Sequence, residues 1–169
     1  MRWDALFRDL EGQALAQEES QWRREVAERT RGERATVALA ARIAAARGTA
    51  VAVDLADGSR IAGDLVDSGG QWLLLDDDGL QRLVPLASVA AIAGLPRRAD
   101  ALTAVEERLT LSHALRALSR DRARVSVRCG VEVVGVIHDV GADHIDIQAD
   151  APREVRTVPI ASIVEVSAR

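Results

Sequence analysis

Side chains that could bind a metal ion occur in three short stretches. Residues 138–139 read H-D and residues 143–144 read D-H, on either side of a predicted hairpin turn. A metal ion there would need a third ligand, which the sequence does not identify. Residues 76–79 read D-D-D-G, without the alternating oxygen ligands and distal glutamate of a calcium loop. We therefore expect two polar hairpins, and no metal or other cofactor.

Residues for covalent chemistry are few. Cys129 is the single cysteine, and it has neither a C-x-x-C partner nor an evident neighbouring base, so we expect an inert, packed thiol. The chain contains no G-x-S-x-G motif, no phosphate-binding loop and no paired catalytic acids. The sequence predicts a protein that is not an enzyme.

A group of basic residues allows a different chemistry. These residues are Arg116, Arg120, Arg122, Arg124 and Arg128, around the end of a predicted helix and the strand after it. If they converge, they form a local phosphate-binding face, with Trp72 and His144 as candidates to stack on bases. The alternative is a solvated helix end, because arginines in a last helical turn also complement the helix dipole.

These residues lie within a sequence that occurs twice. Residues 84–89 read V-P-L-A-S-V and residues 158–163 read V-P-I-A-S-I, at a spacing of 74 residues. Residues 51–65 match residues 125–137, with two residues fewer in one turn. A repeat of this length indicates a duplicated domain.

Each copy predicts one helix followed by five short strands. Helices are expected at 33–47 and 110–121, and strands in the first copy at 51–55, 61–66, 72–75, 81–86 and 89–92. The third to fifth strands of the second copy are expected at 144–147, 155–160 and 163–166. Gly63 and Gly135 mark a sharp bend or a close backbone approach in the second strands. The predicted fold is α+β, with two tandem, bent, five-stranded antiparallel barrels, each preceded by a helix.

The predicted domains are a helical arm (1–32), the first helix and barrel (33–94), a connection (95–109) and the second helix and barrel (110–169). The arm places its apolar residues at helical spacing, and these are Trp3, Leu6, Phe7 and Leu10, with Trp22 further along. This apolar strip packs either on the same chain or on a second subunit or partner protein.

The pattern V-x-V-x-L-x-D-G-x-x-x-x-G-x-L over residues 51–65, with Asp67 and the L-L-L at 73–75, resembles the first signature of the Sm-like fold. The resemblance implies a small barrel of a family that binds single-stranded RNA as rings. The family's RNA-contacting Asn and Arg-Gly pair have no counterpart, because the chain contains no Asn and reads V-P-L-A-S-V at the later position. The whole chain, beginning M-R-W-D-x-L-F-x-D-L-E, also resembles small actinobacterial proteins of unassigned role that are sometimes labelled Fis-type regulators.

Composition limits the functional classes. The net charge of −4 gives no overall attraction to a polyanion, and a single cysteine suits a reducing compartment. We expect a cytoplasmic protein without a signal peptide or membrane span. The leading hypothesis is a non-enzymatic regulatory or adaptor protein with an unidentified protein partner, forming a homodimer or small homo-oligomer through free strand edges or the arm. The alternative is a regulator that binds single-stranded RNA or DNA.

Overall fold

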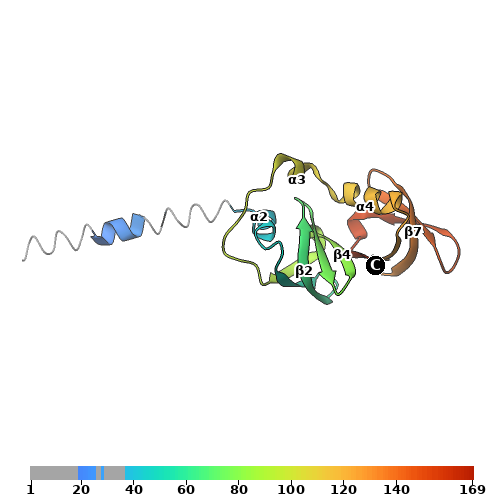
Figure 1. Ribbon diagram of the computed structural model, residues 1–169, viewed down its shortest axis with the longest axis horizontal. Helices are drawn as coiled ribbons and strands as arrows, with labels where there is room; N and C mark the ends of the chain where they lie inside the picture. Colours follow the sequence, from blue (N-terminus) through green and yellow to red (C-terminus); the bar gives the residue numbers. More distant parts are fainter. Residues whose placement is uncertain (1–18, 26–27, 29–36) are drawn as a thin grey trace, which may run out of the picture. The chain divides into compact units, whose positions relative to one another are not determined.

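The computed structural model of the chain describes residues 19–25, 28 and 37–169 (Figure 1). It divides the chain into two units, residues 1–37 and 38–169. In the first unit, residues 19–25 are helical. Four residues of the predicted apolar strip, Trp3, Leu6, Phe7 and Leu10, lie outside the described residues.

The second unit contains both copies of the repeat. The first copy comprises α2 (Leu39–Ala44), β1 (Ala50–Leu55), β2 (Arg60–Ser68), β3 (Trp72–Asp77), β4 (Leu80–Pro85), the 3-10 turn η1 (Leu86–Ser88) and β5 (Val89–Ala93). A connection with α3 (Ala104–Arg108) leads to the second copy. This comprises α4 (Leu111–Arg120), β6 (Arg124–Arg128), β7 (Glu132–Val140), β8 (His144–Ala149), β9 (Val155–Pro159), η2 (Ile160–Ser162) and β10 (Glu165–Ala168). The predicted element order is confirmed.

Several predicted boundaries are wrong, among them the end of the first helix, which is predicted at 47 and lies at Ala44. The first helix begins at Leu39, because Ala38 is extended (ψ 148°) and supplies no side-chain cap. The last strand begins at Glu165, because the amide of Ile163 donates to the carbonyl oxygen of Ile160 within the 3-10 turn. The second helix follows the prediction, with Thr110 as its N-cap and Asp121 as its C-cap.

The strands form one antiparallel sheet and not two closed barrels. The order among the described residues is β5-β1-β2-β3-β4-β10-β6-β7-β8-β9. Within each copy the fourth and fifth strands lie at opposite edges of the five, so neither copy closes on itself. Instead, β4 of the first copy pairs with β10, the fifth strand of the second copy. The finding is therefore an α+β fold with an open ten-stranded sheet.

The two glycines that the copies share in their second strands, Gly63 and Gly135, lie where backbones come close together. A Cβ atom on Gly63 would lie 2.5 Å from the carbonyl oxygen of Asp76, and one on Gly135 would lie 2.1 Å from that of Gln148. The strand register shifts slightly further along, between Leu65 and Asp67 in the first copy. The prediction of close approach is confirmed, and the irregularity that bends the strand follows the glycine.

Two hydrophobic cores stabilise the second unit, and they do not follow the sequence boundary between the copies. The first contains Ile43, Leu65 and Leu75. The second is built around Leu115 and Ile147 but also takes Trp72 and Leu83 from the first copy. The copies therefore share a core, which fixes the position of the junction between them.

Candidate functional site

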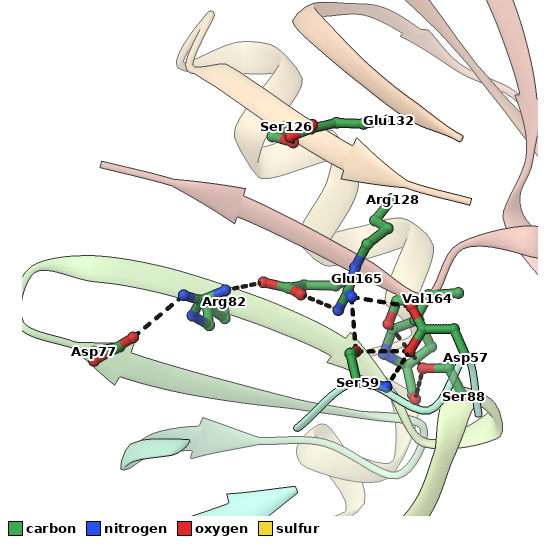
Figure 2. Close-up of polar contacts among 11 residues, drawn as sticks. Asp57, Ser59, Asp77, Arg82, Ser88, Ser126, Arg128, Glu132, Val164 and Glu165 are labelled. Carbon is green, nitrogen blue, oxygen red and sulfur yellow. Dashed lines mark hydrogen bonds and ion pairs between the residues drawn. The ribbon is translucent and has the colours of Figure 1, made fainter. Parts of the chain in front are cut away.

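The most connected polar site lies where β4 and β10 meet (Figure 2). In this pair of strands Leu83 is opposite Val166, and Arg82 is opposite Ser167. Glu165, one residue before this pairing, faces Arg128 on β6. The strand register thus brings one side chain of the first copy and two of the second to a single place.

Glu165 is the centre of this junction network. Its side chain is only 6% exposed. Nη1 of Arg82 lies 2.6 Å from Oε1, and Nη2 of Arg128 lies 2.5 Å from Oε2, so each carboxylate oxygen receives one guanidinium. Partial burial works against the charge on Arg82, but the hydrogen bonds and charges of Glu165 and Asp77 together outweigh it and raise the pKa of Arg82.

Arg128 connects the junction network to the first copy. Its Nη1 donates to Ser59 Oγ at 2.7 Å and lies 3.0 Å from Oδ2 of Asp57, in the turn between β1 and β2. Asp57 also accepts from the hydroxyl and amide of Ser59, at 2.6 and 3.0 Å. These hydrogen bonds from Ser59, followed by the charge of Arg128, lower the pKa of Asp57.

Ser88 adds a second contact across the junction. Its hydroxyl lies 2.8 Å from the carbonyl oxygen of Pro85 in its own copy and 2.8 Å from that of Val164 in the other. The ion pairs of this network and their hydrogen bonds join the two copies and favour one strand register, because any other register would leave buried charges unpaired.

The sequence prediction missed this site, although the repeat carried a signal. Glu165 stands where the first copy has Ala91, and Arg128 stands where it has Asp54. The two copies therefore differ in charge at both of these positions. Ala91 lies opposite Asp54 in the first copy, and Glu165 lies opposite Arg128 in the second, so both differences occur at the same pair of facing positions.

The structure divides the predicted arginine cluster. Arg124 pairs with Asp150 (2.7 Å), and Arg128 is part of the junction network. Within the described residues, the side chains of Arg116, Arg120 and Arg122 make no hydrogen bond or ion pair. Arg116 lines a cavity of about 690 Å³ that loops of both copies also line, among them Gln71 and Ile160.

One predicted stacking residue is not available for that role. Trp72 is 7% exposed, and its Nε1 donates to the carbonyl oxygen of Leu109 at 2.8 Å. The prediction overlooked the connection before α4, which covers the ring. His144 remains accessible, with its side chain 44% exposed.

The remaining candidate site residues contact only residues that are close to them in the sequence. Nδ1 of His144 lies 2.8 Å from Oδ1 of Asp143, and this contact raises the pKa of the histidine and lowers that of the aspartate. Asp78 and Gly79 form the tip of the β3–β4 hairpin with positive φ. Sγ of Cys129 lies 3.6 Å from the carbonyl oxygen of Val131. Across residues 19–25, 28 and 37–169, no group of three acidic, histidine or cysteine residues is arranged to hold a metal ion.

Of the predicted partner-binding residues, the structure describes Trp22. It lies on the helical segment 19–25 and is 65% exposed. No helix in the described part of the chain is long and apolar enough to cross a bilayer.

No protein-family model matches the chain, and no curated protein has a significant sequence match to it.

Proposed function

We propose that the chain is a non-enzymatic regulatory or adaptor protein, built from two Sm-like domains, that acts through protein–protein interaction and self-association. One observation carries the proposal: among the described strands, β5 and β9 end the sheet and each has a partner on one side only. Unpaired backbone groups along an edge strand are a template for a strand of another chain.

The composition of these edges supports an interface. β5 reads V-A-A-I-A, with Ala90, Ala91 and Ala93 exposed, and it carries neither a charge nor a proline. Edge strands that must stay unpaired usually carry such residues. β9 does carry a charge at Arg156 and ends at Pro159, but its Val155 is 56% exposed. An uncharged edge and an exposed valine favour pairing with another strand over solvation.

The first test is the mass of the full chain in solution. We expect light scattering at micromolar concentrations to give a mass of two or more chains. Two surfaces could mediate assembly, the strand edges and the N-terminal arm. A full-length variant with serine at Trp3, Leu6, Phe7 and Leu10 distinguishes between them. An unchanged mass assigns assembly to the strand edges, and a fall to monomer assigns it to the arm. A monomeric parent protein contradicts self-association.

Nucleic-acid binding is the second candidate, and the unpaired arginines of α4 favour it. Arg116 and Arg120 are four residues apart and therefore share one face of the helix. If the protein is an adaptor, we expect it to bind single-stranded RNA and duplex DNA only weakly in filter-binding titrations at physiological salt. Tight binding with a steep salt dependence would favour this second candidate instead.

The matched variants decide which residues are responsible. Glutamine at Arg116, Arg120 and Arg122 should abolish such binding if these residues contact phosphates. Glutamine at Arg153, an exposed arginine on the β8–β9 connection, serves as the control. Tight binding that is lost only in the triple variant would overturn the adaptor proposal.

A further inference from the structure

A polar cavity of about 410 Å³ lies in the second copy, between the end of α4 and the strands β7 and β8. α4 packs against β7 in this copy (Figure 1). Val136 and Ile137 form the apolar part of its lining. The rest of the lining consists of four side chains that can donate hydrogen bonds, and these are Ser119, Arg122, His138 and Gln148. None of these described lining residues belongs to the junction network, so the cavity is a separate site.

The four donor side chains are available to a ligand. Across residues 37–169 they make no hydrogen bond or ion pair, and no described carboxylate lines the cavity. Asp121, the residue before Arg122, lines a different cavity beside Trp72. A guanidinium, an imidazole, a hydroxyl and an amide around one cavity favour a ligand that supplies negative charge and several acceptor atoms.

The backbone of Arg122 indicates that its side chain has a role. Its φ of 49° lies in the left-handed region, which a residue with a Cβ atom rarely adopts. The equivalent residue of the first copy is Gly48, with a φ of 78°. Because glycine ends a helix in this conformation without steric cost, the helix end by itself does not require an arginine. Strained residues of this kind cluster at ligand-binding sites.

Arg122 is also not needed to satisfy the last carbonyl groups of α4. The amide of Arg122 donates to the carbonyl oxygen of Ser119 at 3.1 Å, and the amide of Ala123 donates to that of Leu118 at 3.2 Å. Unpaired carbonyl groups at a helix end would attract the guanidinium and repel an anion. Because these are paired, the positive charge of Arg122 remains available to a ligand in the cavity.

An irregularity in β7 exposes His138. The register with β8 shifts between Ile137 and Asp139, so His138 is the extra residue of a bulge. A bulge changes the direction in which a side chain points from a strand. The first copy has the same irregularity, and its residue Val66 is 48% exposed. The fold thus provides an exposed position here, and the second copy has an imidazole at it.

The first copy has no comparable set of donors. The alignment of the two copies places apolar or acidic residues at the four donor positions, in the order Ala45, Gly48, Val66 and Asp76. Three of these residues have no side-chain donor, and the carboxylate of Asp76 would repel an anion. The donors are therefore specific to the second copy and are not a requirement of the duplicated fold.

We propose that this cavity binds the terminal phosphate of a small phosphate monoester, with Arg122 supplying the positive charge and the other three donors binding the phosphate oxygens. The site is additional to the adaptor function and does not depend on self-association. A phosphate monoester offers three strong acceptor oxygens and a charge of about −2, so it can use all four donors. A carboxylate is already satisfied by one guanidinium. The volume of the cavity leaves room beside Val136 for a small organic body.

Isothermal titration calorimetry of the full chain with methyl phosphate, at constant ionic strength, tests the site. We expect saturable binding with a Kd of about 1 mM or tighter, which a ligand of this size can reach. Dimethyl phosphate has a single charge and fewer terminal oxygens, and it should bind about tenfold more weakly or worse.

Two variants that copy the first domain identify the residues responsible. Arg122→Gly should weaken binding about tenfold or more without lowering the urea midpoint, because glycine adopts a positive φ without strain. His138→Val places the first copy's residue at the bulge and should also weaken binding. Arg120→Gln is the control, because Arg120 is exposed on α4 but does not line the cavity. It should leave the Kd within about twofold, since exposed charges outside a site are screened.

Each other outcome overturns the proposal in a different way. Absence of saturable binding removes the site, and so does binding that neither Arg122→Gly nor His138→Val weakens. Equal losses in Arg120→Gln and Arg122→Gly show diffuse attraction to a positive surface and not binding in the cavity. Equal affinities for methyl and dimethyl phosphate overturn the choice of a monoester and favour the phosphodiester of a nucleic acid.

Discussion

Replacing Gly135 with alanine is expected to lower the free energy of unfolding by about 3 kcal/mol. The new Cβ would lie 2.1 Å from the carbonyl oxygen of Gln148 and 2.8 Å from its carbonyl carbon. These are backbone atoms of the paired strand β8, so relief requires β7 and β8 to separate. Gly63→Ala should have a smaller but similar effect, because its closest contact is 2.5 Å. Urea unfolding followed by circular dichroism measures both.

Gly70→Ala is the matched control for the two glycine variants. Its Cβ would come no closer than 3.7 Å to another residue, which is an ordinary van der Waals distance. We expect a change of less than about 0.5 kcal/mol. If Gly135→Ala unfolds at the same urea concentration as this control, the backbones of β7 and β8 do not approach each other as closely as described.

Glu165→Ala is expected to cost about 3 kcal/mol of unfolding free energy, because it leaves two guanidinium groups without their common counter-ion. The side chains of Arg82 and Arg128 retain 21% and 31% exposure, which places the effect towards the lower end for buried pairs. Urea unfolding is again the measurement. Glu132→Ala removes an exposed carboxylate from β7, two strands away from β10, and it should cost less than about 1 kcal/mol.

A compensating variant distinguishes an unpaired charge from lost packing. Methionine at Arg82 and Arg128, combined with leucine at Glu165, should recover most of the loss, since apolar groups of similar volume often replace a buried ionic cluster without penalty. If the triple variant is as unstable as Glu165→Ala, the cost arises from shape and not from charge.

Local signals in the sequence predicted the local structure. Alternation at Val51, Val53 and Leu55 predicted β1, and the D-G pair at 57–58 predicted a turn in which Gly58 takes a φ of 83°. The repeated glycines predicted close approach. Each of these features depends on residues near one another in the chain, or on a steric limit that glycine alone satisfies.

The pairing between copies could not be predicted in the same way. The burial pattern of a fourth strand is the same whether it pairs with the fifth strand of its own copy or with the fifth strand of the other copy. The sequence of the strand therefore does not distinguish between the two pairings. The environment of Trp72 depends on Leu109, 37 residues away. The arginine cluster was divided by its carboxylate partners, and Glu165 is likewise 37 residues from Arg128. Such contacts follow from topology, which periodicity does not encode.

The covalent link between the copies has a consequence for how the protein responds to its own abundance. Two separate domains would pair through strands like β4 and β10 only above their dissociation constant. In one chain, the connection through α3 holds the two strands at a high effective concentration, so their pairing is independent of dilution. Low expression therefore cannot leave this junction open, and every molecule that is synthesised carries one completed interface from the moment it folds.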